Sequence, residues 1–122
     1  MSKRIALVCV VTLLLDTAAI ARDDDRYGAI AYSRHTRHYG YWKGAESRAG
    51  AERRALEACK GRDCRIEVWF RNSCGALATG EGGQVVGWAH ENRLHEAEER
   101  AIRACRNEGG RHCEVVISAC SR

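Results

Sequence analysis

The chain has 122 residues, no proline and seven cysteines, and its formal net charge at pH 7 is +4. Its 45% hydrophobic and 30% charged residues are typical of one folded globular domain, and they exclude collagen, coiled-coil and low-complexity chains. The modest positive charge also argues against a protein that binds nucleic acid.

The first segment predicts a secretory signal peptide. Two basic residues precede an apolar run over residues 5–15, which is too short to cross a bilayer as a helix. Small residues stand at the positions that a signal peptidase reads before a cleavage after Ala21. We therefore expect residues 1–21 to be removed. The remaining chain, residues 22–122, would have six cysteines and no stable membrane anchor, in the periplasm of a bacterium or outside the cell.

The rest of the chain contains an internal repeat. Several stretches recur at an offset of 46 or 47 residues, among them 28–31 as 75–78 and 51–59 as 97–105. So many matches at a nearly constant offset are not expected by chance. We therefore expect a single domain made of two equivalent units, residues 27–74 and 75–120.

Six strands are predicted, three in each unit. They share a β-prone composition and are bounded by turn residues: 27–33, 39–43, 64–71, 75–79, 84–89 and 113–119. The first two strands of each unit are joined by a short turn, which is basic in the first unit and glycine-rich in the second. Each such pair predicts a hairpin.

A helix is expected after each hairpin. In the second unit the apolar residues follow a helical spacing, at Leu94, Ala97, Ala101, Ile102 and Cys105. Residues 51–59 repeat this spacing in the first unit. Asn92 would cap the start of the second helix, Ser47 or Glu46 would lie near the start of the first, and glycines would end both. The order in each unit is therefore β-β-α-β.

This order predicts an α+β fold. We expect one antiparallel or mixed sheet of about six strands, with two helices on one face and a pseudo-twofold axis between the units. Alanine-rich helices bury little apolar surface, so disulfide bonds are expected to hold the fold together.

An even number of cysteines in an exported chain indicates a disulfide framework. In each unit, one cysteine at the helix end is followed closely by another at the start of the last strand. Local pairing of these leaves two cysteines at the unit ends to pair across the repeat. The predicted bonds are Cys59–Cys64, Cys105–Cys113 and Cys74–Cys120. A zinc site is the alternative, but the chain has no Cys-x-x-Cys pair.

Four segments together resemble a family of secreted bacterial proteins catalogued as domain of unknown function 4189. They are residues 27–33, 51–59, 64–74 and 113–121. The resemblance covers nearly all of the chain after the signal peptide. It implies a small exported domain with paired cysteines, and it carries over no activity and no catalytic residue. The turn at residues 34–38 departs from the family, because it is more basic than the small polar turn expected there.

Catalytic and metal-binding motifs do not emerge. A surface metal site of His35, His38 and His90 is conceivable, because imidazole binds zinc, copper and nickel, but solvated turn residues are the simpler explanation. The glycine-rich turn at residues 80–83 lacks the ending of a phosphate-binding loop and joins two strands. We therefore assign no catalytic residue, no metal ligand and no cofactor.

The first hairpin is the candidate binding site. It contains Arg34, His35, Arg37, His38, Tyr39, Tyr41 and Trp42. Strand alternation places Tyr39 and Tyr41 on one face and Trp42 on the other. Arginine and aromatic residues dominate the contacts of protein interfaces. The equivalent turn of the second unit is rich in glycine and has few side chains, so the two units differ most at this hairpin.

These observations favour a small non-enzymatic binding protein whose partner is another protein. An inhibitor or an immunity-type protein would suit such a scaffold. The alternatives are a small secreted enzyme that acts on envelope material, and a structural or stress-related envelope component. The sequence assigns no oligomeric state.

Overall fold

The computed structural model describes residues 24–122, and the predicted signal peptide lies outside the described residues. In chain order the elements are β1 (Tyr27–Tyr32), β2 (Tyr39–Ala45), α1 (Arg48–Ala58), β3 (Arg65–Arg71), β4 (Cys74–Thr79), the short 3₁₀ helix η1 (Glu81–Gly83), β5 (Val86–Glu91), α2 (Leu94–Asn107) and β6 (Glu114–Cys120). The predicted order of strand, strand, helix and strand therefore occurs twice. Across this part of the chain, each helix is too short or too polar to cross a membrane.

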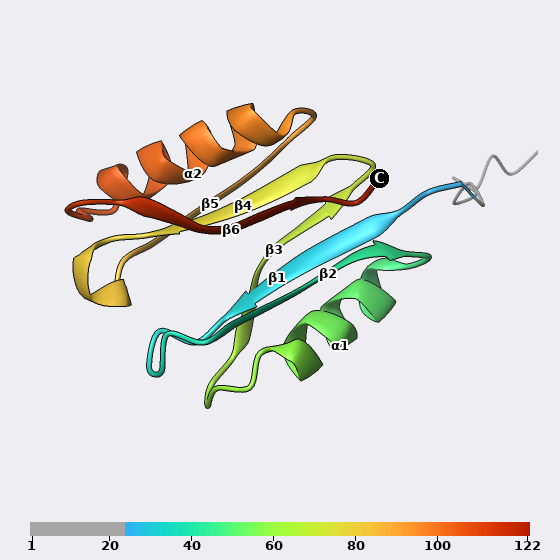
Figure 1. The fold of residues 1–122 in the computed structure, drawn as a ribbon, viewed down its shortest axis with the longest axis horizontal. Helices are drawn as coiled ribbons and strands as arrows, with labels where there is room; N and C mark the ends of the chain where they lie inside the picture. The colour runs from blue at the N-terminus through green and yellow to red at the C-terminus, as the bar shows by residue number, and fades with distance from the viewer. Residues whose placement is uncertain (1–23) are drawn as a thin grey trace, which may run out of the picture.

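The strands form two three-stranded antiparallel sheets, in the orders β2-β1-β3 and β5-β4-β6. Helix α1 packs on the first sheet and α2 on the second. The sheets pack against each other through their other faces, so the helices form the two outer layers (Figure 1). The α+β class is confirmed. The single six-stranded sheet with both helices on one face was wrong.

Two packed sheets form in place of one because small and large apolar residues alternate along the central strands. In β1, Ala29 and Ala31 contact α1, whereas Ile30 and Tyr32 face the second sheet. In β4 the same alternation places alanines against α2 and Leu77 against the first sheet. Each central strand is therefore buried on both faces. Alanines let a helix lie close on one side, and the larger residues fill the space between the sheets.

Seven buried residues from both sheets form the central core: Ile30, Tyr32, Val68, Phe70, Leu77, Val86 and Ala119. The half-buried side chains of Val116 and Ile117 pack against them. Strands of both sheets thus share one core.

Glycine sets how closely each helix approaches its sheet. A Cβ atom on Gly40 in β2 would lie 2.3 Å from the carbonyl oxygen of Ala55, and one on Gly87 in β5 would lie 2.2 Å from the backbone nitrogen of Cys105. Both atoms belong to a helix backbone, one in α1 and the other in α2, so they cannot rotate out of the way. Gly40 and Gly87 stand 47 residues apart, at the offset of the repeat.

We expect Gly40→Ala and Gly87→Ala each to lower the free energy of unfolding by about 3 kcal/mol, because strand and helix must separate. Urea denaturation measures the loss. The matched control is Gly44→Ala in the same strand, where a Cβ meets nothing within 4 Å but φ is +75°. Its strained backbone should cost about 1 kcal/mol. A larger loss at Gly44 than at Gly40 would contradict the close approach.

The two helices begin differently. The Ser47 hydroxyl, expected only near the start of α1, caps the helix and accepts a hydrogen bond from the backbone N–H of Gly50 at 3.0 Å. The prediction of Asn92 as the cap of α2 was wrong, because Arg93 occupies that position and provides no side-chain cap. Strand β5 runs on to Glu91, and the chain needs two further residues to turn into the helix.

The structure contains the three disulfide bonds that the spacing predicts. Their Cα atoms are 6.2 Å apart for Cys59–Cys64, 6.1 Å for Cys105–Cys113 and 3.9 Å for Cys74–Cys120. The first two join the end of a helix region to the strand that follows. The third was expected to bridge the two units. It instead joins β4 to β6, which are neighbours in the second sheet, because β4 already begins at its first cysteine.

Candidate functional site

The structure places the basic residues of the first hairpin, Arg34, His35, Arg37 and His38, in an exposed turn between β1 and β2. The aromatic side chains that follow are also exposed, 43% for Tyr39, 40% for Tyr41 and 39% for Trp42. Side chains on both faces of β2 are therefore partly exposed, and β2 lies at the edge of its sheet.

The aromatic residues divide between the two faces of β2, in agreement with strand alternation. Tyr39 and Tyr41 are paired with Tyr32 and Ile30, so they lie on the face toward the second sheet. Trp42 lies on the face toward α1, where the Arg54 guanidinium stacks over its ring at 4.6 Å. The turn and the two tyrosines therefore form one continuous surface, and Trp42 belongs to a neighbouring one.

A groove of about 480 Å³ runs beside this surface. Arg37 and Tyr39 line one side, and the β4–β5 turn with His112 and Val116 lines the other. The groove thus lies between the edge of the first sheet and the edge of the second. Two of the predicted residues, Arg37 and Tyr39, therefore face a hollow that the second sheet also lines.

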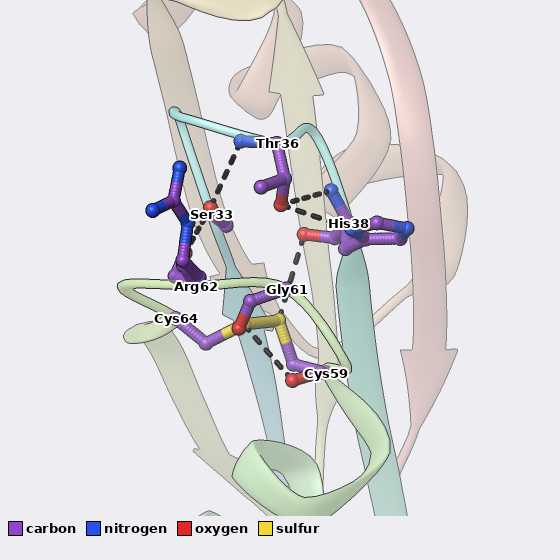
Figure 2. The surroundings of a disulfide bond; sticks show 7 residues. All are labelled: Ser33, Thr36, His38, Cys59, Gly61, Arg62 and Cys64. Atoms are coloured by element: carbon purple, nitrogen blue, oxygen red, sulfur yellow. Dashed lines mark hydrogen bonds between the residues drawn. A yellow bond between two sulfur atoms is a disulfide. The ribbon is translucent and has the colours of Figure 1, made fainter.

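The loop between α1 and β3 holds the turn in place (Figure 2). The buried hydroxyl of Ser33 donates to the carbonyl oxygen of Arg62 and accepts from the backbone N–H of Thr36 at 3.1 Å. Gly61 packs so closely that a Cβ there would lie 2.1 Å from the Thr36 hydroxyl oxygen. The Cys59–Cys64 bond closes this loop, with the Cys59 sulfur 3.5 Å from the carbonyl oxygen of His38.

The equivalent turn of the second unit supports the first hairpin from the other side. The phenol of Tyr32 donates to the carbonyl oxygen of Gly83 at 2.8 Å, and the Gln84 amide donates to the carbonyl oxygen of Arg34 at 2.9 Å. Glycine in the second turn allows this close approach, because a Cβ on Gly83 would lie 2.8 Å from the Tyr32 oxygen. One turn serves as the support and the other carries the exposed side chains.

Burial raises the pKa of the Tyr32 phenol, and the nearby Arg37 and Arg34 guanidinium groups partly oppose this effect. The neutral phenol is therefore favoured in the folded chain. Its contribution to stability is fully present below pH about 10 and is lost as the pH rises through the raised pKa.

We expect Tyr32→Phe to lower the free energy of unfolding at pH 7 by about 1–2 kcal/mol, because the buried carbonyl of Gly83 loses its donor. The same variant should remove part of the alkaline destabilisation. Denaturant unfolding at a series of pH values between about 9 and 12 measures both effects. Identical alkaline slopes for the two proteins would show that Tyr32 does not link pH to stability.

The conceivable metal site is not formed. Within residues 24–122, the histidine, cysteine, aspartate and glutamate side chains bring no three ligands together that could hold a metal ion. In the first turn, the ring of His35 contacts Arg62 and the ring of His38 contacts Thr36. Both contacts are made between exposed side chains.

Sequence reasoning missed the contribution of residues 60–65. These residues precede β3 and lie far from the hairpin along the chain, yet the Arg62 guanidinium contacts His35 across 27 positions. The available signal was the predicted Cys59–Cys64 bond, which closes a short basic loop at the start of a strand beside β1.

The chain is similar to one known protein family and to one solved structure. Residues 27–120 match the family described as "Domain of unknown function (DUF4189)". The fold is similar to that in the NMR structure of Rv1813c from Mycobacterium tuberculosis, at 33% sequence identity and a TM-score of 0.57. That match covers 78% of this chain and 74% of the mycobacterial chain. No curated protein matches the sequence.

Proposed function

The chain belongs to the DUF4189 family, and from its surface we propose that this member is a non-enzymatic protein that binds another protein through the β1–β2 hairpin. The observation that carries the proposal is the set of exposed arginine, histidine and tyrosine side chains from Arg34 to Tyr41. Arginine and tyrosine are among the residues that contribute most to binding at protein interfaces.

The rigidity of the turn supports this role. The first hairpin is held by the α1–β3 loop, by the β4–β5 turn and by a disulfide bond that closes the loop next to it. A surface that is ordered before binding loses less conformational entropy when the partner arrives. The exposed side chains therefore stand on a frame that is suited to a tight complex.

The disulfide framework indicates where such a complex would form. Three disulfide bonds in a domain of this size are typical of proteins that fold in an oxidising compartment. We place the protein in the bacterial periplasm or outside the cell, after removal of the predicted signal peptide. A rigid, exported binder of this kind suits an inhibitor or an immunity-type protein.

We also propose that the two units arose by duplication and are related by a pseudo-twofold axis. The strand orders correspond, and each central strand has its register shift toward the last strand at an equivalent place, after Ile30 in β1 and after Leu77 in β4. Superposition of the two halves in an experimental structure tests this relation. A poor fit outside the first two strands of each unit would reject it.

Replacing Arg34, His35, Arg37 and His38 together with serine tests the proposed function. The wild-type protein, immobilised and incubated with envelope extract of its own producing cells, should retain a specific protein partner. The variant should lose that partner, because its backbone frame is intact but its contact side chains are gone.

Thermal unfolding of the variant provides the control, because a partly unfolded hairpin would also lose its partner. A second control is a surface variant on α2 with the substitutions His95→Ser, Glu96→Ser and Arg103→Ser. This variant should retain the partner. Full retention by the hairpin variant would remove this surface from consideration. Capture of no protein by the wild type would reject the binding role.

A further inference from the structure

We propose that the β1–β2 turn and the α1–β3 loop together form a basic surface that binds a carboxylate-rich segment of a protein partner. This inference rests on the proposed function, and it adds a second loop to the site and the chemistry of the partner. We call residues 33–38 and 59–67 the basic surface.

The basic surface holds the entire net positive charge of the described chain. It has five basic residues, Arg34, Arg37, Lys60, Arg62 and Arg65, and two acidic residues, Asp63 and Glu67. The rest of residues 24–122 has twelve basic and twelve acidic residues. The equivalent segments of the second unit, 80–85 and 105–116, have two basic and three acidic residues. The basic surface and the equivalent segments of the second unit therefore have net charges of opposite sign.

The two loops of the basic surface touch each other. The Arg62 guanidinium lies 3.0 Å from the Nε2 atom of His35, and the Arg62 carbonyl accepts a hydrogen bond from Ser33. Close packing of Gly61 against Thr36 continues the contact (Figure 2). Because the Cys59–Cys64 bond closes the second loop, it restrains the backbone that carries these charged side chains.

Most of these cations have no acidic partner. Among the described residues, Arg37, Lys60, Arg62 and Arg65 are all exposed and form no ion pair. Arg34 is the exception, and its Nε atom lies 3.8 Å from a carboxylate oxygen of Glu67. A hollow of about 470 Å³ beside the turn is lined by Arg34, His35 and Arg65. Arginine side chains bind carboxylates with two parallel hydrogen bonds, so the surface suits a ligand with several such groups.

The composition of the surface favours a protein over a uniform polyanion. Asp63 and Glu67 stand between the cations, and they would repel the continuous charge of a nucleic acid or an anionic bilayer. A protein can place its carboxylates beside the cations and leave these two positions uncharged. The exposed rings of Tyr39 and Tyr41 continue the surface and offer apolar contact that a protein can match.

Titration with poly-L-glutamate, followed by amide chemical shifts in the disulfide-intact protein, tests the inference. We expect shifts confined to the basic surface, and binding about ten-fold weaker when the salt concentration rises from about 50 mM to about 300 mM. The variant Lys60→Ser, Arg62→Ser, Arg65→Ser should bind about ten-fold more weakly than wild type. The matched control removes three exposed helix charges, Arg53→Ser, Arg103→Ser and Arg106→Ser, and should bind as wild type does.

Shifts centred on the helices, or equal losses in the two variants, would overturn the inference. Tighter binding of oligothymidylate or of phosphatidylglycerol vesicles at the same loops would also overturn it, because the partner would not be a protein. The captured envelope partner separates this inference from the proposed function. If it remains bound to the Lys60, Arg62 and Arg65 variant, the inference fails and the binding role stands.

Discussion

Replacing Phe70 with alanine is expected to lower the free energy of unfolding by about 3–5 kcal/mol. The Phe70 side chain is 1% exposed and lies in the core between the two sheets. A Cβ on Gly28 would lie 2.2 Å from its ring, and a Cβ on Gly75 would lie 2.3 Å from it. One glycine from each sheet thus makes the space that the ring fills. Neither glycine has a side chain that could refill a cavity left by the substitution.

Chemical denaturation measures this loss, and Trp69→Ala is the matched control. Trp69 is the next residue along β3, but its ring is 37% exposed and lies on the opposite face of the strand. Its removal should cost less than half as much. If both substitutions cost the same, the packing between the sheets would not be the main source of stability.

The disulfide bonds should differ in their contribution to stability according to the length of chain that they enclose. The chain-entropy relation predicts a loss of about 4 kcal/mol for Cys74→Ala with Cys120→Ala, and about 2 kcal/mol for Cys59→Ala with Cys64→Ala. The two bonds span 46 and 5 positions of the sequence. The longer bond also closes the second sheet at the place where the first sheet pairs Tyr27 with Arg71.

Reversible unfolding of the two double variants, with the remaining bonds verified by peptide mapping, measures the difference. A greater loss from the short bond would show that it contributes through native contacts with the first hairpin. The α1–β3 loop would then depend on its disulfide for stability to a greater degree than chain entropy accounts for.

Much of the local structure could be predicted from the sequence. All six strands and both helices occur where periodicity and turn residues placed them, within a few positions. Ser47 was predictable as a cap because its hydroxyl needs only the next turn of its own helix. Local patterns of this kind are decided by residues close in the chain.

The arrangement of the sheets depended on long-range contacts that no local pattern shows. The alternation of Ala29 and Ile30 reads as a strand in either arrangement. What decides between one sheet and two is that both faces of the strand carry apolar residues. A single open sheet with helices on one face would leave Ile30 and Leu77 exposed to water. Pairing the sheets face to face buries both.

The candidate site was half predictable. The basic hairpin was visible as a difference between the two units, and the structure leaves its side chains exposed. The loop with Lys60 and Arg62 was not visible, because it meets the hairpin only after β1 and β3 pair. The supporting role of Gly83 was likewise hidden in a turn that the sequence made appear bare.

Site-specific photo-cross-linking in the producing cells tests the central claim most directly. A photoreactive benzoylphenylalanine replaces His35 in the exposed turn in one variant, and Glu96 on the outer helix α2 in the other. Binding through the first hairpin predicts a covalent adduct with one protein from position 35 and none from position 96. Adducts of equal yield at both positions, or an adduct from position 96 alone, would contradict it.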